Sequence, residues 1–190
     1  MTISVLSTPA PGGEPLTLDE AKDHVAFRGT DKDALLTTLI GEARAEAEAI
    51  INQHLITRRV RLTLDRFPAN IVLPVWPVRA VHQVAYDDRD GVEQVLDASA
   101  WKLRTSRRPY EIWPAYGQSW PSTRGDIDDV RIDIDVGYST PGEMSAAIKT
   151  AIKLILGTRY AHREDVVVGT VAAELPSSAS RLLMPHKFWT

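Results

Sequence analysis

The sequence contains no cysteine among its 190 residues. This absence excludes disulfides, thiolate nucleophiles and cysteine-based zinc or iron–sulfur sites. Long apolar runs are missing too, since none approaches the roughly 18 to 20 residues that a membrane span needs, and residues 1–15 lack the basic and apolar segments of a leader peptide. We therefore expect a protein that is made and kept in the cytosol, outside membranes, and that is stabilised by packing or by assembly.

The sequence also lacks an excess of positive charge. Its 22 Lys and Arg residues are outnumbered by 25 Asp and Glu residues, which gives a net charge of −3. This sign argues against a protein whose main task is to coat nucleic acid. Hydrophobic residues make up 44% of the chain and charged residues 25%, close to the globular average, so we expect one ordinary domain or a compact core with an insertion.

Helical periodicity is present in both terminal parts of the chain. Thr17 and Glu20 have the spacing of a capping box, which predicts the start of a short helix over about 18–26. Apolar residues then recur at intervals of three and four, which predicts a long amphipathic helix over about 31–54. Similar patterns predict two later helices, over about 144–163 and 177–183.

Between these segments, apolar and polar residues alternate with a period near two, which predicts one small antiparallel sheet. Residues 87–91 have the Asp and Gly composition of a hairpin turn. In the last strand, Arg131, Asp133 and Asp135 alternate with apolar residues, so we expect them on a solvated face. The expected strands lie over about 60–64, 71–73, 78–86, 92–96, 101–103 and 130–136.

These patterns predict an α+β fold, in which a small bundle of amphipathic helices carries an inserted antiparallel β-sheet region and an extended C-terminal tail. The two long helices are natural partners, because each has one apolar face that must be covered. The predicted parts are a flexible lead-in over 1–15, a helical core over 16–55 and 139–165, an inserted β region over 56–138, and the tail over 166–190.

Motifs for catalysis are scarce. The five histidines are scattered and no pair has the spacing of a metal site. Ser119 lacks the second glycine and the strand-to-helix turn of a nucleophile elbow, and the glycines form no phosphate-binding fingerprint. We therefore predict no catalytic residues, no cofactor and no metal ligands. An acidic group is better explained as solvated charge than as a cation site; its members are Asp126, Asp128, Asp129, Asp133 and Asp135.

Two groups of exposed apolar residues are candidates for protein contacts. Tyr110, Trp113, Tyr116 and Trp120 lie in one stretch, and the sequence leaves open whether they form an interface or a lid on the core. The C-terminus is unusually apolar and interrupted by Pro and Ser, a pattern that favours a peptide donated to a partner over one packed on its own helices. Its candidate contact residues are Leu182, Leu183, Met184, Pro185, Phe188 and Trp189.

Several short segments, in one order along nearly the whole chain, resemble the head-tail connector, or adaptor, proteins of tailed bacteriophages and gene transfer agents. Each segment is weak alone, but the ordered set is specific. The segments are LTLDEAK (16–22), DALL (33–36), LTLDRFP (62–68), IVLP (71–74), VAYDD (84–88), PAYGQSWP (114–121), VGY (136–138), YAHRE (160–164) and AELP (173–176).

The resemblance implies a structural protein without enzymatic activity, located at the head–tail junction of a virion or gene transfer agent particle that assembles in the bacterial host cytoplasm. Its copies would form a ring, usually of twelve, beneath the portal protein, and would offer a surface to a stopper or tail-completion protein. The C-terminal segment would reach into the portal, and DNA would pass through the lumen without specific binding. Asp126, Asp128 and Asp129 are candidates to line that lumen, where a basic wall would retain the genome.

Two alternatives remain. One is a small DNA-handling protein of the packaging apparatus that uses a basic patch; it predicts strongly salt-dependent DNA binding. The other is a hydrolase with an acidic metal site, which predicts a melting temperature that changes with calcium or magnesium. The basic patch comprises Arg58, Arg59, Arg61 and Arg66, with Arg104, Arg107 and Arg108 further along the chain.

Overall fold

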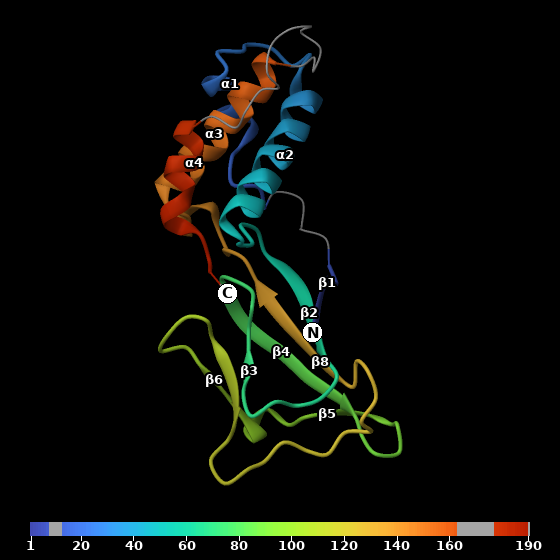
Figure 1. The fold of residues 1–190 in the computed structure, drawn as a ribbon. Helices are drawn as coiled ribbons and strands as arrows, with labels where there is room; N and C mark the ends of the chain where they lie inside the picture. The colour runs from blue at the N-terminus through green and yellow to red at the C-terminus, as the bar shows by residue number, and fades with distance from the viewer. Residues whose placement is uncertain (8–12, 163–176, 190) are drawn as a thin grey trace, which may run out of the picture. The chain divides into compact units, whose positions relative to one another are not determined.

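The computed structural model describes residues 1–7, 13–162 and 177–189. The chain forms two compact units, each with its own hydrophobic core. The described residues of 1–10 and 57–137 form the sheet unit, and those of 11–56 and 138–189 form the helical unit (Figure 1). The architecture is mixed α+β, as the sequence predicts. In the order of the sequence, most residues of the sheet unit come after the first long helix and before the second.

The helical unit confirms the helices expected from periodicity. The Thr17–Glu20 capping box forms as predicted, because the backbone N–H of Thr17 donates to Glu20 Oε2 at 3.0 Å and that of Glu20 donates to Thr17 Oγ1 at 3.1 Å. These two bonds satisfy donors that a helix N-terminus otherwise leaves unpaired. The helices are α1 (Leu18–His24), α2 (Asp33–Ile51), α3 (Ala146–Ala161) and α4 (Ser177–Leu183).

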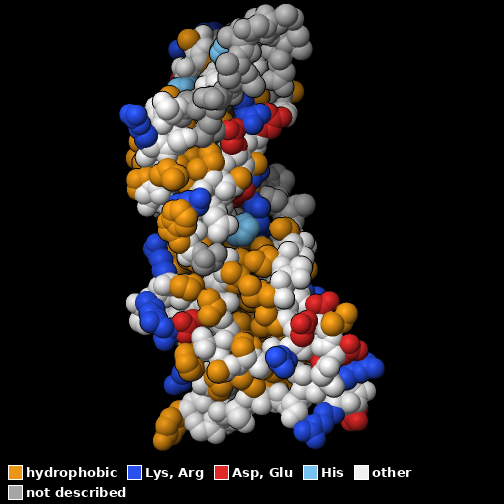
Figure 2. Space-filling model, viewed as in Figure 1, with side chains coloured by type: hydrophobic (Ala, Val, Ile, Leu, Met, Phe, Trp, Pro, Cys, Tyr) orange, Lys and Arg blue, Asp and Glu red, His pale blue; other side chains and the backbone are white. Residues whose placement is uncertain are grey.

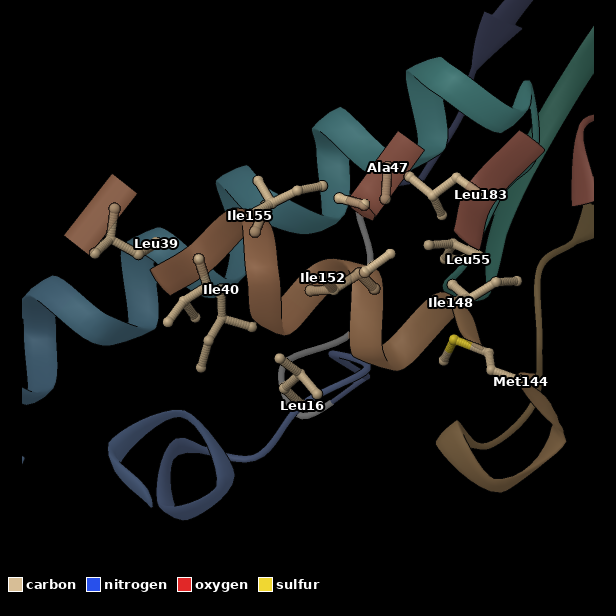
Figure 3. Close-up of a cluster of buried hydrophobic side chains, with 14 of the residues drawn as sticks. Leu16, Leu39, Ile40, Ala47, Leu55, Met144, Ile148, Ile152, Ile155 and Leu183 are labelled. Atoms are coloured by element: carbon tan, nitrogen blue, oxygen red, sulfur yellow. The ribbon is translucent and has the colours of Figure 1, made fainter. Parts of the chain in front are cut away.

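The core of the helical unit lies where α2, α3 and α4 meet. Ile40 and Ala47 of α2 and Ile152 and Ile155 of α3 lie between the two long helices (Figure 3). Each helix therefore buries the apolar face that its period of 3.6 creates. Leu183 of α4 is fully buried in the same cluster, so the C-terminal helix is part of this core.

The sheet unit holds two antiparallel sheets in the described part of the chain, where the sequence predicts one. The larger sheet has the strand order β1-β2-β8-β4-β5, and the smaller has the order β3-β7-β6. The strands of the larger sheet are β1 (Thr2–Val5), β2 (Arg58–Leu64), β8 (Val130–Val136), β4 (Val78–Asp87) and β5 (Glu93–Val95). Those of the smaller are β3 (Ile71–Val72), β7 (Glu111–Pro114) and β6 (Trp101–Arg104).

The core of the sheet unit lies between the two sheets. Val60 and Leu62 of β2 and Ile132 of β8 are fully buried on one face of the larger sheet, together with Ile71 and Ile112 of the smaller. Alternate residues of the same strands form the opposite, charged face. The predicted hairpin also forms, since β4 and β5 pair on either side of residues 88–92.

Two strands differ from the expectations. Residues 2–5 form β1, which pairs with β2 in the register Thr2↔Thr63 to Val5↔Val60, so the predicted lead-in is wrong there. The proline- and glycine-rich residues that follow suggested an irregular segment, but β2 offers an edge to which the alternating residues can bond. Likewise, Glu111–Pro114 lies outside the expected strands and forms β7. Residues 8–12 of the lead-in lie outside the described residues, as do residues 166–176 and 190 of the predicted tail.

Candidate interaction surfaces

The acidic residues before β8 are used by the fold itself. Asp129 is only 2% exposed, and its Oδ2 accepts hydrogen bonds from the backbone N–H groups of Gly125, at 2.6 Å, and Asp126, at 2.9 Å. The carboxylate therefore holds the turn that leads into the strand. The prediction of solvated charge is wrong for Asp129, because the turn supplies backbone donors that replace water.

A ladder of ion pairs crosses the charged face of the larger sheet. Arg59 donates to Asp135 at 2.7 and 3.1 Å, and Arg61 donates to Asp133 at 2.7 and 2.9 Å. The hydrogen bond from Arg59 holds the pKa of Asp135 below its ordinary range. Asp133 is buried, so the prediction of a solvated carboxylate is wrong for this residue as well. A strand period identifies the face of a residue but not the arginine that the neighbouring strand places over it.

These pairs also bear on the predicted phosphate patch. Arg59 and Arg61 each face a carboxylate across β2 and β8, so their charges are balanced within the sheet. A guanidinium in a two-bond carboxylate pair has its charge balanced and two of its five N–H donors occupied, so it attracts a phosphate less strongly than a free one. The pairing weakens the DNA-handling alternative, which relies on these two arginines together with Arg58 and Arg66.

In residues 1–7, 13–162 and 177–189, no three His, Asp or Glu side chains are grouped so that they could hold a metal ion. Over those ranges, no helix is both long enough and apolar enough to cross a membrane.

The four aromatic candidates divide into packed and exposed pairs. Trp120 stacks on Phe67 with 4.9 Å between ring centroids, and Tyr110 packs edge-on against Trp76 at 5.0 Å. Both belong to the margin of the sheet core. Trp113 is 39% exposed, and Tyr116 is 99% exposed. Trp120 and Tyr110 therefore pack as a lid on the core would, whereas Trp113 and Tyr116 present exposed surface. Hydrophobic side chains gather over the face of the sheet unit seen in Figure 2.

Beside Trp113 lies a buried carboxylate that the sequence did not single out. Glu111 accepts a hydrogen bond from Trp113 Nε1 at 2.7 Å and one from Asn70 Nδ2 at 3.1 Å, and it forms ion pairs with Arg104 and Arg107. Burial alone would raise the pKa of Glu111, but the bond from Trp113 and the two positive charges outweigh it and lower the pKa. This cluster fixes the Trp113 ring at the surface of the smaller sheet.

The C-terminal candidates lie on α4, on the turn η3 (Met184–His186) and just beyond it. Leu183 and Phe188 are buried, whereas Met184, Pro185 and Trp189 are exposed and Leu182 is partly buried. The backbone N–H of Phe188 donates to the Ile51 carbonyl at 2.7 Å, which ties the segment to the end of α2.

The expectation that all six side chains are free for a partner therefore does not hold for Leu183 and Phe188. Asn52 has a left-handed backbone that ends α2, and its Nδ2 donates to the Phe188 carbonyl at 3.3 Å. Gln53 Nε2 donates to the His186 carbonyl as well. Sequence alone could not favour this outcome, because it depends on polar groups at the far end of another helix.

A third surface, the edge of β1 that no other described strand pairs with, is not among the sequence predictions. Ile3, Val5 and Leu6 are exposed, although each residue is apolar. The alternation in Thr2, Ile3, Ser4 and Val5 was the signal that could have identified this strand.

Comparisons with known proteins give structural matches only. No protein-family model and no curated protein matches the sequence. Among solved structures, a chain from the neck of an empty gene transfer agent particle, computed with C6 symmetry, has a TM-score of 0.76 and 23% identity. A chain from the virion of a native gene transfer agent particle has a TM-score of 0.76 and 25% identity. A chain from the neck of a native particle, computed with C12 symmetry, has a TM-score of 0.74 and 22% identity.

Each match covers 100% of this chain and 97% of the other. The whole fold, with both units, therefore occurs in chains of gene transfer agent particles. These neighbours are particle components, which supports the prediction that the chain is not an enzyme.

Proposed function

We propose that this chain is a structural component of the neck of a gene transfer agent or tailed phage particle, where it acts as the head-tail connector. The full-length match to chains from particle necks carries this proposal. In this role the protein sits beneath the portal, joins the DNA-filled head to the stopper or tail, and is assembled in the bacterial host cytoplasm. The ordered sequence segments that resemble connector proteins support the same role.

The connector acts as a ring of copies, and twelve is the proposed number. The similar chains come from necks computed with C6 and C12 symmetry, which supports a cyclic arrangement. A ring multiplies a weak contact of one copy into strong attachment, because all copies engage a symmetric partner at once.

The C-terminal segment is the proposed contact with the portal. Met184, Pro185 and Trp189 present exposed apolar surface, while Leu183 packs in the helical core and buried Phe188 is held by its backbone bond to Ile51. This division supports a contact made by the exposed set on a backbone that the buried set holds in place. Preorganisation of this kind lowers the ordering cost of binding.

Trp113 and Tyr116 are the proposed contact with the stopper or tail-completion protein. Exposed Trp and Tyr side chains are enriched in protein interfaces, and the Glu111 cluster fixes the Trp113 ring. Tyr110 and Trp120 pack on the sheet core, and we assign them a structural role beside this contact.

DNA is proposed to pass through the ring without specific binding. The net charge of −3 and the exposed Asp126 and Asp128 suit a conduit that does not retain DNA. Asp129 is excluded from the lumen wall, because its side chain is buried in the turn. Reversing the charges of Asp126 and Asp128 should reduce DNA delivery by the particles. Unchanged delivery would remove these two residues from the lumen.

The test of the connector role is a pull-down from particle-producing cells with the affinity-tagged chain, followed by mass spectrometry. The intact chain should recover portal and tail proteins. The variant Met184→Asp with Trp189→Ser should lose the portal, whereas the control Ile127→Ser, which removes an exposed apolar side chain from the sheet unit, should keep it. A chain that ends at Ser180 is unsuitable as the test variant, because it would also lack Leu183, which is part of the helical core. Recovery of neither protein by the intact chain would contradict the proposed function.

A further inference from the structure

The apolar face of the larger sheet continues onto β1, where the described residues leave it uncovered. In the register of β1 and β2, Ile3 lies opposite Leu62 and Val5 lies opposite Val60. Side chains of directly opposed residues share a face, so Ile3 and Val5 extend the core face of the sheet. Leu62 and Val60 are fully buried, yet Ile3 is 42% exposed. The smaller sheet therefore covers β2 but stops short of β1.

The outer edge of β1, away from β2, has backbone groups without a described partner strand. The N–H of Leu6 donates to the Arg59 carbonyl at 2.9 Å, so the even-numbered residues bond to β2 and the N–H and C=O groups of Ile3 and Val5 point away from it. Within the described residues, no strand pairs with this outer edge. Natural edge strands are usually protected by charges, proline or a bulge, and Thr2–Val5 has none of these. Such an edge is suited to receive a strand from a partner.

The opposite edge of the larger sheet, as described, is β5. All four strand pairings between β1 and β5 are antiparallel, so these two outer strands run in the same direction. Val92 and Val95 beside this edge are exposed. A rotation about a ring axis brings one edge of each copy to the other edge of its neighbour and keeps the sense of the strands. The two edges can therefore meet as a parallel pair.

We propose that the larger sheet continues from copy to copy in the ring, with β1 of one copy paired in parallel with β5 of the next. The occupant of the open edge is thus a second copy of this chain. The inference rests on the proposed function, because the cyclic symmetry of the similar necks is what favours a head-to-tail contact. A contact between two β1 strands would instead be two-fold and antiparallel, and would close a dimer rather than a ring.

Cross-linking in purified particles tests the pairing. Ser4 lies opposite Arg61, and Val95 lies opposite Ala85 and so next to Arg131, which places Ser4 and Val95 on the same charged face. The chain has no cysteine, so the double variant Ser4→Cys with Val95→Cys carries the only two thiols that it can contribute. A short bis-maleimide should produce a ladder of covalent oligomers. No ladder in particles that contain the variant, or dimers from Ser4→Cys alone, would overturn the proposal.

A matched pair of substitutions gives a second test. Ile3→Lys places a charge on the open edge, whereas Val72→Lys places one on β3, and both wild-type side chains are 42% exposed. The Ile3 variant should enter particles at least tenfold less than wild type, with an unchanged melting temperature, while the Val72 variant should enter normally. Normal entry of Ile3→Lys would contradict the edge contact. If the wild-type chain is itself missing from purified particles, the proposed function fails instead.

Discussion

Arg61 and Asp133 face each other across β2 and β8, joined by two hydrogen bonds of 2.7 and 2.9 Å. Gln83 of β4 donates to the same carboxylate at 3.2 Å. The buried Asp133 carboxylate of β8 therefore links to both neighbouring strands, β2 and β4, through side-chain hydrogen bonds. A carboxylate in this position stabilises the sheet only while its donors are present, because burial without partners is costly.

Replacing Asp133 with Ala should destabilise the protein by about 2 kcal/mol, since Arg61 and Gln83 would lose a charged acceptor. Denaturant unfolding measures this loss. Asp135→Ala is the comparison, because that carboxyl is more exposed and its loss should cost less. The double variant Arg61→Met with Asp133→Leu should recover much of the stability. An equal loss at both aspartates would show that burial of the pair is not what matters.

Acid should destabilise the sheet unit. Hydrogen bonds from Arg59 lower the pKa of Asp135, and those from Arg131 lower the pKa of Asp87. A carboxyl with a lower pKa when folded contributes stability that is complete well above its unfolded pKa of about 3.9 and is lost as the pH falls through its folded pKa. The melting temperature should therefore decline as the pH drops below about 5. Asp135→Asn should make this decline shallower, and an unchanged slope would contradict the assignment.

Thr17→Ala should destabilise the helical unit by about 1 kcal/mol, because the capping box loses the oxygen that bonds the N–H of Glu20. Thr17→Ser keeps that oxygen and should stay near wild type. Thermal unfolding followed by circular dichroism distinguishes the two. If both variants melt alike, the cap contributes nothing measurable to this unit.

Neighbouring residues of the C-terminal segment should respond in opposite ways. Phe188→Ala should lower the unfolding free energy by roughly 3 kcal/mol, because the residue is only 6% exposed and a smaller side chain would leave a cavity. Trp189 is 70% exposed, so Trp189→Ala should leave stability within about 0.5 kcal/mol of wild type and weaken portal capture. A large stability loss at Trp189 would mean that its ring packs within the chain.

Local patterns predicted most of the elements. The capping box at Thr17 and the period of 3.6 placed α1, α2 and α3 within a few residues, because both signals come from neighbours in the sequence. The short helix α4 was also predicted with its observed limits, Ser177–Leu183. Amphipathic period alone did not reveal whether this helix packs on its own chain.

Long-range partners decided what the sequence could not. Asp133 bonds to Arg61 in place of water, and the backbone N–H of Phe188 donates to the Ile51 carbonyl. In each pair the partner is far away in the sequence. β1 was missed because the alternation of four residues identifies a strand only once its partner β2 is known. Candidate surfaces were therefore predicted as sets of residues, and the structure divided each set into side chains that pack and side chains that remain exposed.

The pairing of β1 with β2 has a consequence for the order in which the protein is made. Thr2 is translated before Thr63, which it lies opposite in the sheet, and β2 in turn needs β8, whose last residue is Val136. All of α2 is synthesised before β2 and β8 exist. Pairings so distant in sequence form slowly, because a long loop must close first. β1 is thus synthesised well before the strands that hold it, and its apolar residues wait without a partner until β2 and β8 follow.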